Sequence, residues 1–195
     1  MLFSLDVVRA RKGDCLILHY GSEGDPRIVL IDGGPRGVYA ESLKDRLLEI
    51  KDERGIESGK PLPIDLLMVS HMDDDHIQGI LELTKDLLQD DRQFAQVLAF
   101  WHNSFENVIG PPPEQLTSAF AAQFGAASMD GDPPILYLDA DVSDKDEKEV
   151  EASLKLLASV KQGAQLRRDI IDGLMVELNP HFGGELIVGR DLLEV

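Results

Sequence analysis

The first third of the chain alternates between short apolar runs and clusters of turn-forming residues. Three runs rich in β-forming residues, at 2–8, 15–20 and 27–31, predict strands. The segments between them, 11–14 and 21–26, contain the glycine, aspartate and proline typical of tight turns. Because both connections are short, we predict that the three strands form an antiparallel meander.

Farther along, the pattern changes between helical spacing and continuous apolar runs. Segments 41–51 and 77–88 place leucine and isoleucine at helical spacing among charged residues, which predicts two amphipathic helices. Segments 64–69 and 97–101 are short and almost wholly apolar, which predicts strands; the first reads as buried on both faces. Strands interleaved with amphipathic helices predict an α/β fold.

The pattern is weaker in the second half of the chain. A helix is predicted at 114–124, and the acidic run 139–151 is predicted to enter a helix that ends near Lys161. A chain of 195 residues fits one domain. Within it, 1–104 reads as the recognisable core and 105–195 as an insertion or a partial second half.

Composition narrows the class of protein. Hydrophobic content of 43% with 28% charged residues is ordinary for a globular protein, and no apolar run reaches the roughly 18–20 residues that span a bilayer. The N-terminus has no basic segment of the secretory type. The single cysteine, Cys15, lies in an apolar strand, excludes an internal disulfide and reads as a buried core residue. These features predict a cytoplasmic protein with no membrane partner.

The net charge of −17 bears on possible ligands. Nucleic-acid binding is disfavoured, because phosphate contacts need clustered lysine and arginine and the chain offers only small basic groups. A metal-dependent hydrolase remains compatible with this charge, since bound cations offset part of it locally.

The segment between the 64–69 strand and the following helix has the densest set of metal-ligand residue types. His71 and Asp73 are two residues apart and can hold one ion, while Asp75 and His76 can converge on a second. Asp75 would suit the N-cap of the helix. The structural alternative is a solvated acidic turn with incidental histidines.

This His-x-Asp-x-Asp-His sequence, followed by Gly79, resembles the metallo-β-lactamase fold superfamily, whose signature is His-x-His-x-Asp-His after a buried strand. Asp73 stands where the second histidine is usual, and this variant is similar to the soluble domain of bacterial competence (DNA-uptake channel) proteins. The resemblance extends to Gly13-Asp14-Cys15 and to the Asp-Gly-Gly turn at 32–34. It implies an αβ/βα sandwich, of which this chain would carry the N-terminal half plus a helical insertion.

The resemblance implies a site and a reaction. His71 and Asp73 would hold one divalent ion, and Asp75 and His76 a second, the ions being Zn²⁺ or Mn²⁺ with Mg²⁺ as a further option. Asp75 would also orient or deprotonate the attacking water. The implied activity is hydrolysis of a phosphodiester or related ester, or of another small molecule, by a metal-bound hydroxide.

Several other residues admit a site role and a structural one. His102, at the end of a predicted strand, reads equally as a metal-site residue or as a packing histidine. Asp32 reads equally as a hydrogen-bond partner for a ligand histidine and as a turn residue. His181 is interpreted as a loop residue, and Asp139 and Asp141, the candidates for a bridging carboxylate, have a solvated helix start as their alternative.

The superfamily supplies further ligands downstream, and this chain has no clear counterpart for them. The alternative hypothesis is therefore a truncated or non-catalytic metallo-β-lactamase-like module that acts through protein–protein interaction. A homodimer or a partner chain could then complete the fold, because an incomplete sheet leaves an edge that invites pairing.

Overall fold

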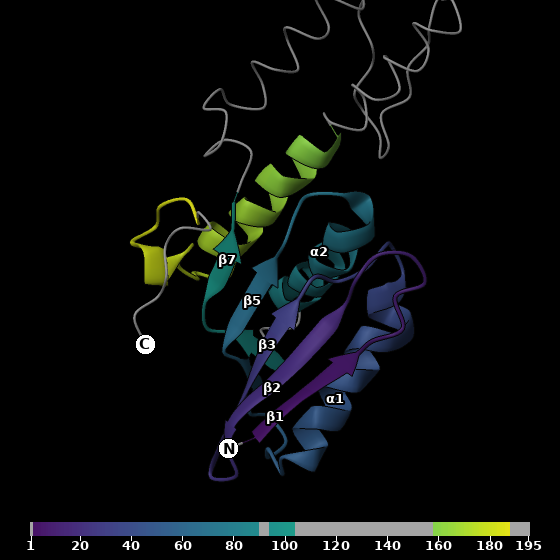
Figure 1. Ribbon diagram of the computed structural model, residues 1–195, viewed down its shortest axis with the longest axis vertical. Coiled ribbons are helices and arrows are strands. Elements are labelled where there is room, and N and C mark those ends of the chain that lie inside the picture. Colours follow the sequence, from purple (N-terminus) through teal and green to yellow (C-terminus); the bar gives the residue numbers. More distant parts are fainter. Residues whose placement is uncertain (1, 90–93, 104–157, 188–195) are drawn as a thin grey trace, which may run out of the picture.

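A mixed five-stranded sheet forms the centre of the molecule (Figure 1). The computed structural model describes residues 2–89, 94–103 and 158–187. The strand order is β1-β2-β3-β5-β7, and β4 and β6 form a separate two-stranded sheet. The strands are β1 (Leu2–Val7), β2 (Leu16–Ser22), β3 (Asp25–Ile31), β4 (Leu62–Ile64), β5 (Leu66–Val69), β6 (Ala95–Val97) and β7 (Phe100–His102).

The predicted meander is confirmed. β1 pairs antiparallel with β2, and β2 pairs antiparallel with β3. The β2–β3 connection is tighter than predicted, because Ser22 pairs directly with Asp25 and leaves two residues for the turn. β5 and β7 then add in parallel, which requires the crossover helices that follow β3 and β5.

Each of the two later apolar runs forms two strands rather than one. At Asp65 the chain leaves the small sheet and enters the main sheet; the Asp65 carboxylate accepts a hydrogen bond from the Ile28 backbone N–H at 2.9 Å. The 97–101 run divides in the same way between β6 and β7. The prediction that 64–69 is buried on both faces is wrong, because Leu66 and Met68 are only half-buried.

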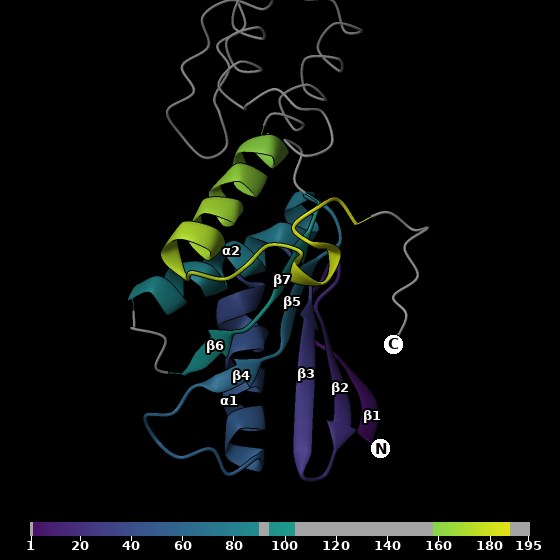
Figure 2. The same ribbon diagram turned by 90° about the vertical axis from the view of Figure 1, so that its left-hand side faces the viewer.

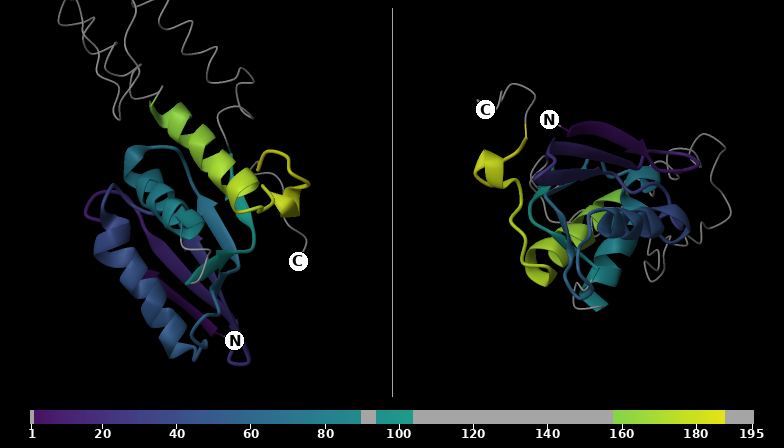
Figure 3. Two further views of the ribbon diagram at one scale, coloured as in Figure 1. Left: turned by 180° about the vertical axis from the view of Figure 1, so that it is seen from behind. Right: turned by 90° about the horizontal axis from the view of Figure 1, so that it is seen from below.

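Helices cover one face of the main sheet (Figures 2 and 3). A π-helical turn, η1 (Tyr39–Leu43), leads into α1 (Lys44–Glu53), and α2 spans Asp74–Gln89. Both predicted amphipathic helices are thus confirmed, with longer bounds. Their apolar sides pack on alternate strand residues to form one core, whose members include Leu47, Ile80, Leu83, Ile17, Leu30 and Leu67.

The third helix on this face spans 158–173, and its last turn, η2 (Asp169–Gly173), is π-helical. The prediction that a helix ends near Lys161 is wrong by three turns. Leu166 and Ile170 join the common core, and Leu178 bridges to Phe100 on β7. A short 3₁₀ turn, η3 (Pro180–Phe182), follows. The helix predicted at 114–124 and the acidic run at 139–151 lie outside the described residues.

The α/β class is therefore confirmed. Across the described part of the chain, none of the helices is both long and apolar enough to cross a membrane.

Candidate functional site

Two glycine-containing turns, at Gly13 and at Gly33–Gly34, meet the 71–76 segment and the start of α2 at the carboxyl ends of β3 and β5. The Gly33 N–H donates to the His76 carbonyl at 2.7 Å, and the Gly79 N–H donates to the Gly34 carbonyl at 3.0 Å. A Cβ on Gly79 would lie 1.9 Å from the backbone carbonyl oxygen of Gly33, so the close approach of these two backbone segments excludes a side chain at Gly79. In the turn at Gly13, a Cβ would lie 1.8 Å from the backbone carbonyl oxygen of Asp75. Close backbone packing therefore fixes the 71–76 segment against two distant turns.

Asp32 is the buried centre of this region. Its side chain is 3% exposed, and its backbone adopts a left-handed conformation with φ of 56°. The carboxylate accepts hydrogen bonds from the Ser70 N–H at 2.8 Å and the Ser70 hydroxyl at 2.6 Å. The same oxygen that binds the hydroxyl lies 2.9 Å from His76 Nδ1. A carboxylate accepts hydrogen bonds, so His76 carries its proton on Nδ1 and presents the lone pair of Nε2.

Asp32 also orients His71 through Ser70. The Ser70 oxygen lies 2.9 Å from His71 Nδ1. Because the single hydroxyl proton is donated to Asp32, the Ser70 oxygen accepts a hydrogen bond from the Nδ1–H of His71. Both histidines therefore present an Nε2 lone pair, and their ring centroids lie 3.8 Å apart.

Each histidine has one carboxylate near its Nε2 atom. His71 Nε2 lies 3.6 Å from an Asp73 oxygen, and His76 Nε2 lies 3.8 Å from an Asp75 oxygen. These are the same two pairs that the sequence predicts. The His76 side chain is 11% exposed, whereas those of His71, Asp73 and Asp75 are 48%, 70% and 46% exposed. We call these four side chains the histidine–aspartate cluster. Asp32 supports the cluster from its buried side, and the other side of the cluster faces solvent.

The donor set fits divalent ions in chemistry and in spacing. Two ligands that bind a tetrahedral ion at ~2.0–2.2 Å stand roughly 3.4 Å from each other. Both nitrogen–oxygen pairs are within a few tenths of an ångström of that separation. Each pair supplies two ligands, and within the described ranges no group of three or more His, Cys, Asp or Glu side chains converges on one point. Water or further residues would complete each coordination shell.

The start of α2 differs from the sequence prediction for Asp75. α2 begins at Asp74, so Asp75 is the second residue of the helix and not its N-cap. Asp74 turns away from the histidines: its carboxylate accepts hydrogen bonds from Gln78 at 2.9 Å and from Gln162 at 2.8 Å. Asp74 thus ties the start of α2 to the 158–173 helix.

His102 lies at the end of β7, beside Val69, and is 2% exposed. Its Nδ1 is 3.5 Å from the Val69 carbonyl, its ring stacks on Phe100, and its buried Nε2 has no hydrogen-bond partner among the described residues. Burial lowers the pKa of His102 to about 4, and the charge of Arg167 acts in the same direction. The structure does not bring His102 into a three-ligand group, and its role as a metal ligand stays a prediction.

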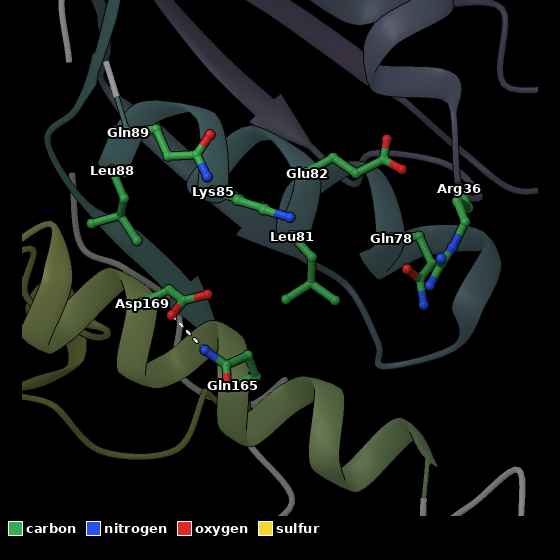
Figure 4. A pocket seen from close by; sticks show the side chains of 9 residues that line it. All are labelled: Arg36, Gln78, Leu81, Glu82, Lys85, Leu88, Gln89, Gln165 and Asp169. Atoms are coloured by element: carbon green, nitrogen blue, oxygen red, sulfur yellow. Dashed lines mark hydrogen bonds between the residues drawn. The ribbon is translucent and has the colours of Figure 1, made fainter. Parts of the chain in front are cut away.

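A groove of about 610 Å³ runs between α2 and the 158–173 helix (Figure 4). Arg36 and Gln78 lie at one end, and Leu88 and Gln89 at the other. Lys85 lies between the two ends of the groove, opposite Gln165 and Asp169 on the 158–173 helix. Gln78, at one end of the groove, donates a hydrogen bond to Asp74 at the start of α2; the histidines and Asp73 and Asp75 are not among the residues that line the groove.

Sequence reasoning missed two contributors. Ser70 precedes the motif and gave no signal, because its role depends on the distant Asp32. Asn179 is fully buried, and its side chain bonds both the N–H and the carbonyl of His102, at 2.9 and 3.0 Å. His181 lies in the η3 turn, where its Nδ1 accepts a hydrogen bond from Trp101 at 3.0 Å. Asp139 and Asp141 lie outside the described residues.

Burial raises the pKa of the Cys15 thiol to about 12, as expected of a core cysteine.

Comparison of this chain with models of known protein families, with characterised proteins and with solved structures finds no match.

Proposed function

We propose that this chain is a metal-dependent hydrolase with a metallo-β-lactamase-like site. The observation that carries the proposal is the position of Asp32, which is bonded directly to His76 and through Ser70 to His71. A carboxylate on the far nitrogen of a histidine is the usual arrangement behind metal ligands, because it fixes the tautomer and raises the basicity of the ligating nitrogen. A solvated acidic turn does not require this buried support.

His71 and Asp73 would hold one ion, and Asp75 and His76 would hold the other. Divalent ions supply Lewis acidity, activate water and stabilise developing negative charge. The mixture of imidazole and carboxylate suits Zn²⁺ or Mn²⁺, and the two aspartates also accommodate Mg²⁺. Asp75 is half exposed and would accept a proton from the attacking water.

The substrate class proposed is a phosphodiester or related ester. The groove beside α2 offers Arg36 and Lys85, whose charges suit a phosphoryl group in a chain that is otherwise strongly acidic. Glu82 lies in the same groove, where it accepts hydrogen bonds from the Gly37 N–H at 3.1 and 3.2 Å. Asp169 also lines the groove, so two cations and two carboxylates share it and it is not an extended basic surface of the kind that binds nucleic acid.

Hydrolysis of bis(4-nitrophenyl) phosphate with Mn²⁺, Zn²⁺ or Mg²⁺ tests this proposal. We expect turnover that is lost in Asp75→Asn and His76→Ala, together with the bound metal. Asp74→Asn is the matched control, because it removes a neighbouring carboxylate that faces Gln78 and Gln162 instead of the histidines. Metal content and hydrolysis that are unchanged in Asp75→Asn and His76→Ala would refute the proposal.

The second candidate is a non-catalytic module that acts through protein–protein interaction. It is favoured by the apolar residues exposed on β1, where Phe3 and Val7 are 76% and 75% exposed. A stoichiometric complex without hydrolysis under any of the three ions would favour it over the hydrolase. Turnover by the isolated chain would exclude it as the sole function.

A further inference from the structure

Among the described residues, α1, α2 and the 158–173 helix lie on one face of the main sheet and leave the β1–β3 part of the opposite face uncovered (Figure 2). Side chains alternate along a strand, so the residues between the core positions point to this face. We call this surface the open face. Its members on β1, β2, β3 and β5 are Phe3, Leu5, Val7, Leu16, Leu18, Tyr20, Ser22, Asp25, Arg27, Val29, Ile31, Leu66 and Met68. None of them is fully buried.

Exposure on the open face is greatest at the edge strand. Phe3, Leu5 and Val7 are 76%, 50% and 75% exposed. At the opposite edge, Trp101 of β7 is in ring contact with His181 and Phe182, so η3 covers that end. Folding of the described residues therefore leaves the β1 side of the face uncovered.

The size of the open face can be compared with known interfaces. Four strands ~4.8 Å apart and about six residues long at ~3.3 Å each give roughly 400 Å² in projection. A contiguous apolar patch of this size matches the largest patch on a typical monomer, about 300–600 Å², and such a patch is often functional. Two such faces together bury about 800 Å² in projection and more as accessible surface, which corresponds to a weak, specific interface.

Charge on the open face favours a second copy as the occupant. Its charged residues are Arg27 and Asp25, which are bonded to each other within one chain at 3.0 Å and leave the face with no net charge. The face is therefore self-complementary: a two-fold axis places apolar side chains on apolar side chains without opposing like charges. The chain's charge of −17 repels a second copy, and this repulsion is screened beyond ~8 Å at physiological ionic strength.

We propose that two copies of this chain associate through their open faces to form a weak dimer. This inference does not depend on the hydrolase proposal, because none of the open-face residues belongs to the histidine–aspartate cluster. Its dissociation constant should lie in the micromolar range, about 10–100 μM. The dimer should tighten with added salt, since screening reduces the repulsion between two acidic chains.

Sedimentation velocity of the full chain from about 1 μM to about 1 mM, with chelator present, tests the proposal. We expect a concentration-dependent dimer that Leu5→Asp and Phe3→Asp each weaken about a hundredfold, since each change acts twice across a two-fold axis. Met175→Asp is the matched control: Met175 is 78% exposed but lies outside the sheet, and its φ of 58° suits aspartate. It should leave the dimer unchanged.

A wild-type chain that stays monomeric throughout, or a dimer that neither Phe3→Asp nor Leu5→Asp weakens, overturns the proposal. Phe3→Asp decides the matter if Leu5→Asp proves unstable, because Phe3 is the more exposed of the two. A photo-crosslinking amino acid at position 3 identifies the occupant. Products between two chains support the dimer, and products within one chain overturn it. If Phe3→Asp or Leu5→Asp abolishes the dimer but the variant still binds metal, the dimer proposal is supported and the hydrolase proposal is unaffected.

Discussion

Replacement of Asp32 by asparagine tests how the site is organised. The carboxylate accepts three hydrogen bonds, from two groups of Ser70 and from His76. In Asp32→Asn one oxygen can still accept the Ser70 N–H, but the amide NH₂ then faces His76 Nδ1. Two donors cannot face each other, so His76 must move its proton to Nε2 and lose the lone pair that would bind metal.

The size of this effect follows from the hydrogen bonds that are lost. Replacing a carboxylate behind a ligand histidine costs 10–100-fold in metal affinity, which is about 1.4–2.7 kcal/mol. Ser70→Ala distinguishes the two ion positions, because it removes the hydrogen-bonded path from Asp32 to His71 but leaves the hydrogen bond between Asp32 and His76. We expect weaker binding at both positions in Asp32→Asn and at one position in Ser70→Ala.

Two assays measure these effects. Nitrogen-15 NMR of the histidine rings at alkaline pH reports the tautomer without any metal, and should place the His76 proton on Nδ1 in the wild type and on Nε2 in Asp32→Asn. Titration calorimetry with Mn²⁺ or Zn²⁺ then gives the affinities. The reasoning is refuted if His76 keeps the same tautomer in both proteins, or if Asp32→Asn binds both ions as tightly as the wild type.

Three further predictions concern stability and reactivity. Gly79→Ala should destabilise the fold by about 1–3 kcal/mol or more in urea unfolding, because its Cβ would lie 1.9 Å from the Gly33 oxygen, whereas Gly24→Ala, with nothing within 4 Å, should be close to neutral. The pKa of His102 is about 4 when folded and 6.5 as the ordinary value, so the unfolded chain takes up this proton first. Stability should therefore fall as pH drops from 6.5 to about 4, by about 3 kcal/mol at most, and this component should be absent from a parallel series with His102→Gln. Cys15, with its pKa raised to about 12, should react with a thiol reagent only at the rate of unfolding; rapid reaction in native buffer would contradict its placement in the core.

The sequence predicts the fold where local pattern and packing agree. The meander and both amphipathic helices follow from apolar spacing and short turns, and the structure confirms them. The same reasoning failed where tertiary pairing decided the outcome. Nothing local shows that Asp65 interrupts a strand, because the break depends on its hydrogen bond to Ile28. The helix beyond Lys161 was missed because Gly163 falls inside it, where the side chain of Met72 occupies the space that a Cβ would fill.

The candidate site was predictable in its residues but not in its support. The pairs His71–Asp73 and Asp75–His76 were predicted from spacing and are the pairs with the short nitrogen–oxygen separations. The path from Asp32 through Ser70 to His71 could not be predicted. It depends on a contact between residues 38 positions apart and on the direction in which a hydroxyl donates.

The most direct test of the central claim is the number of divalent ions that the purified chain binds. Equilibrium dialysis against Mn²⁺ or Zn²⁺, followed by mass-spectrometric metal analysis, should be carried out on the wild type, His71→Ala and His76→Ala. We predict two equivalents in the wild type and about one in each variant. A folded wild-type chain that binds no metal, or variants that bind as much as the wild type, would contradict the claim that these residues form a metal site.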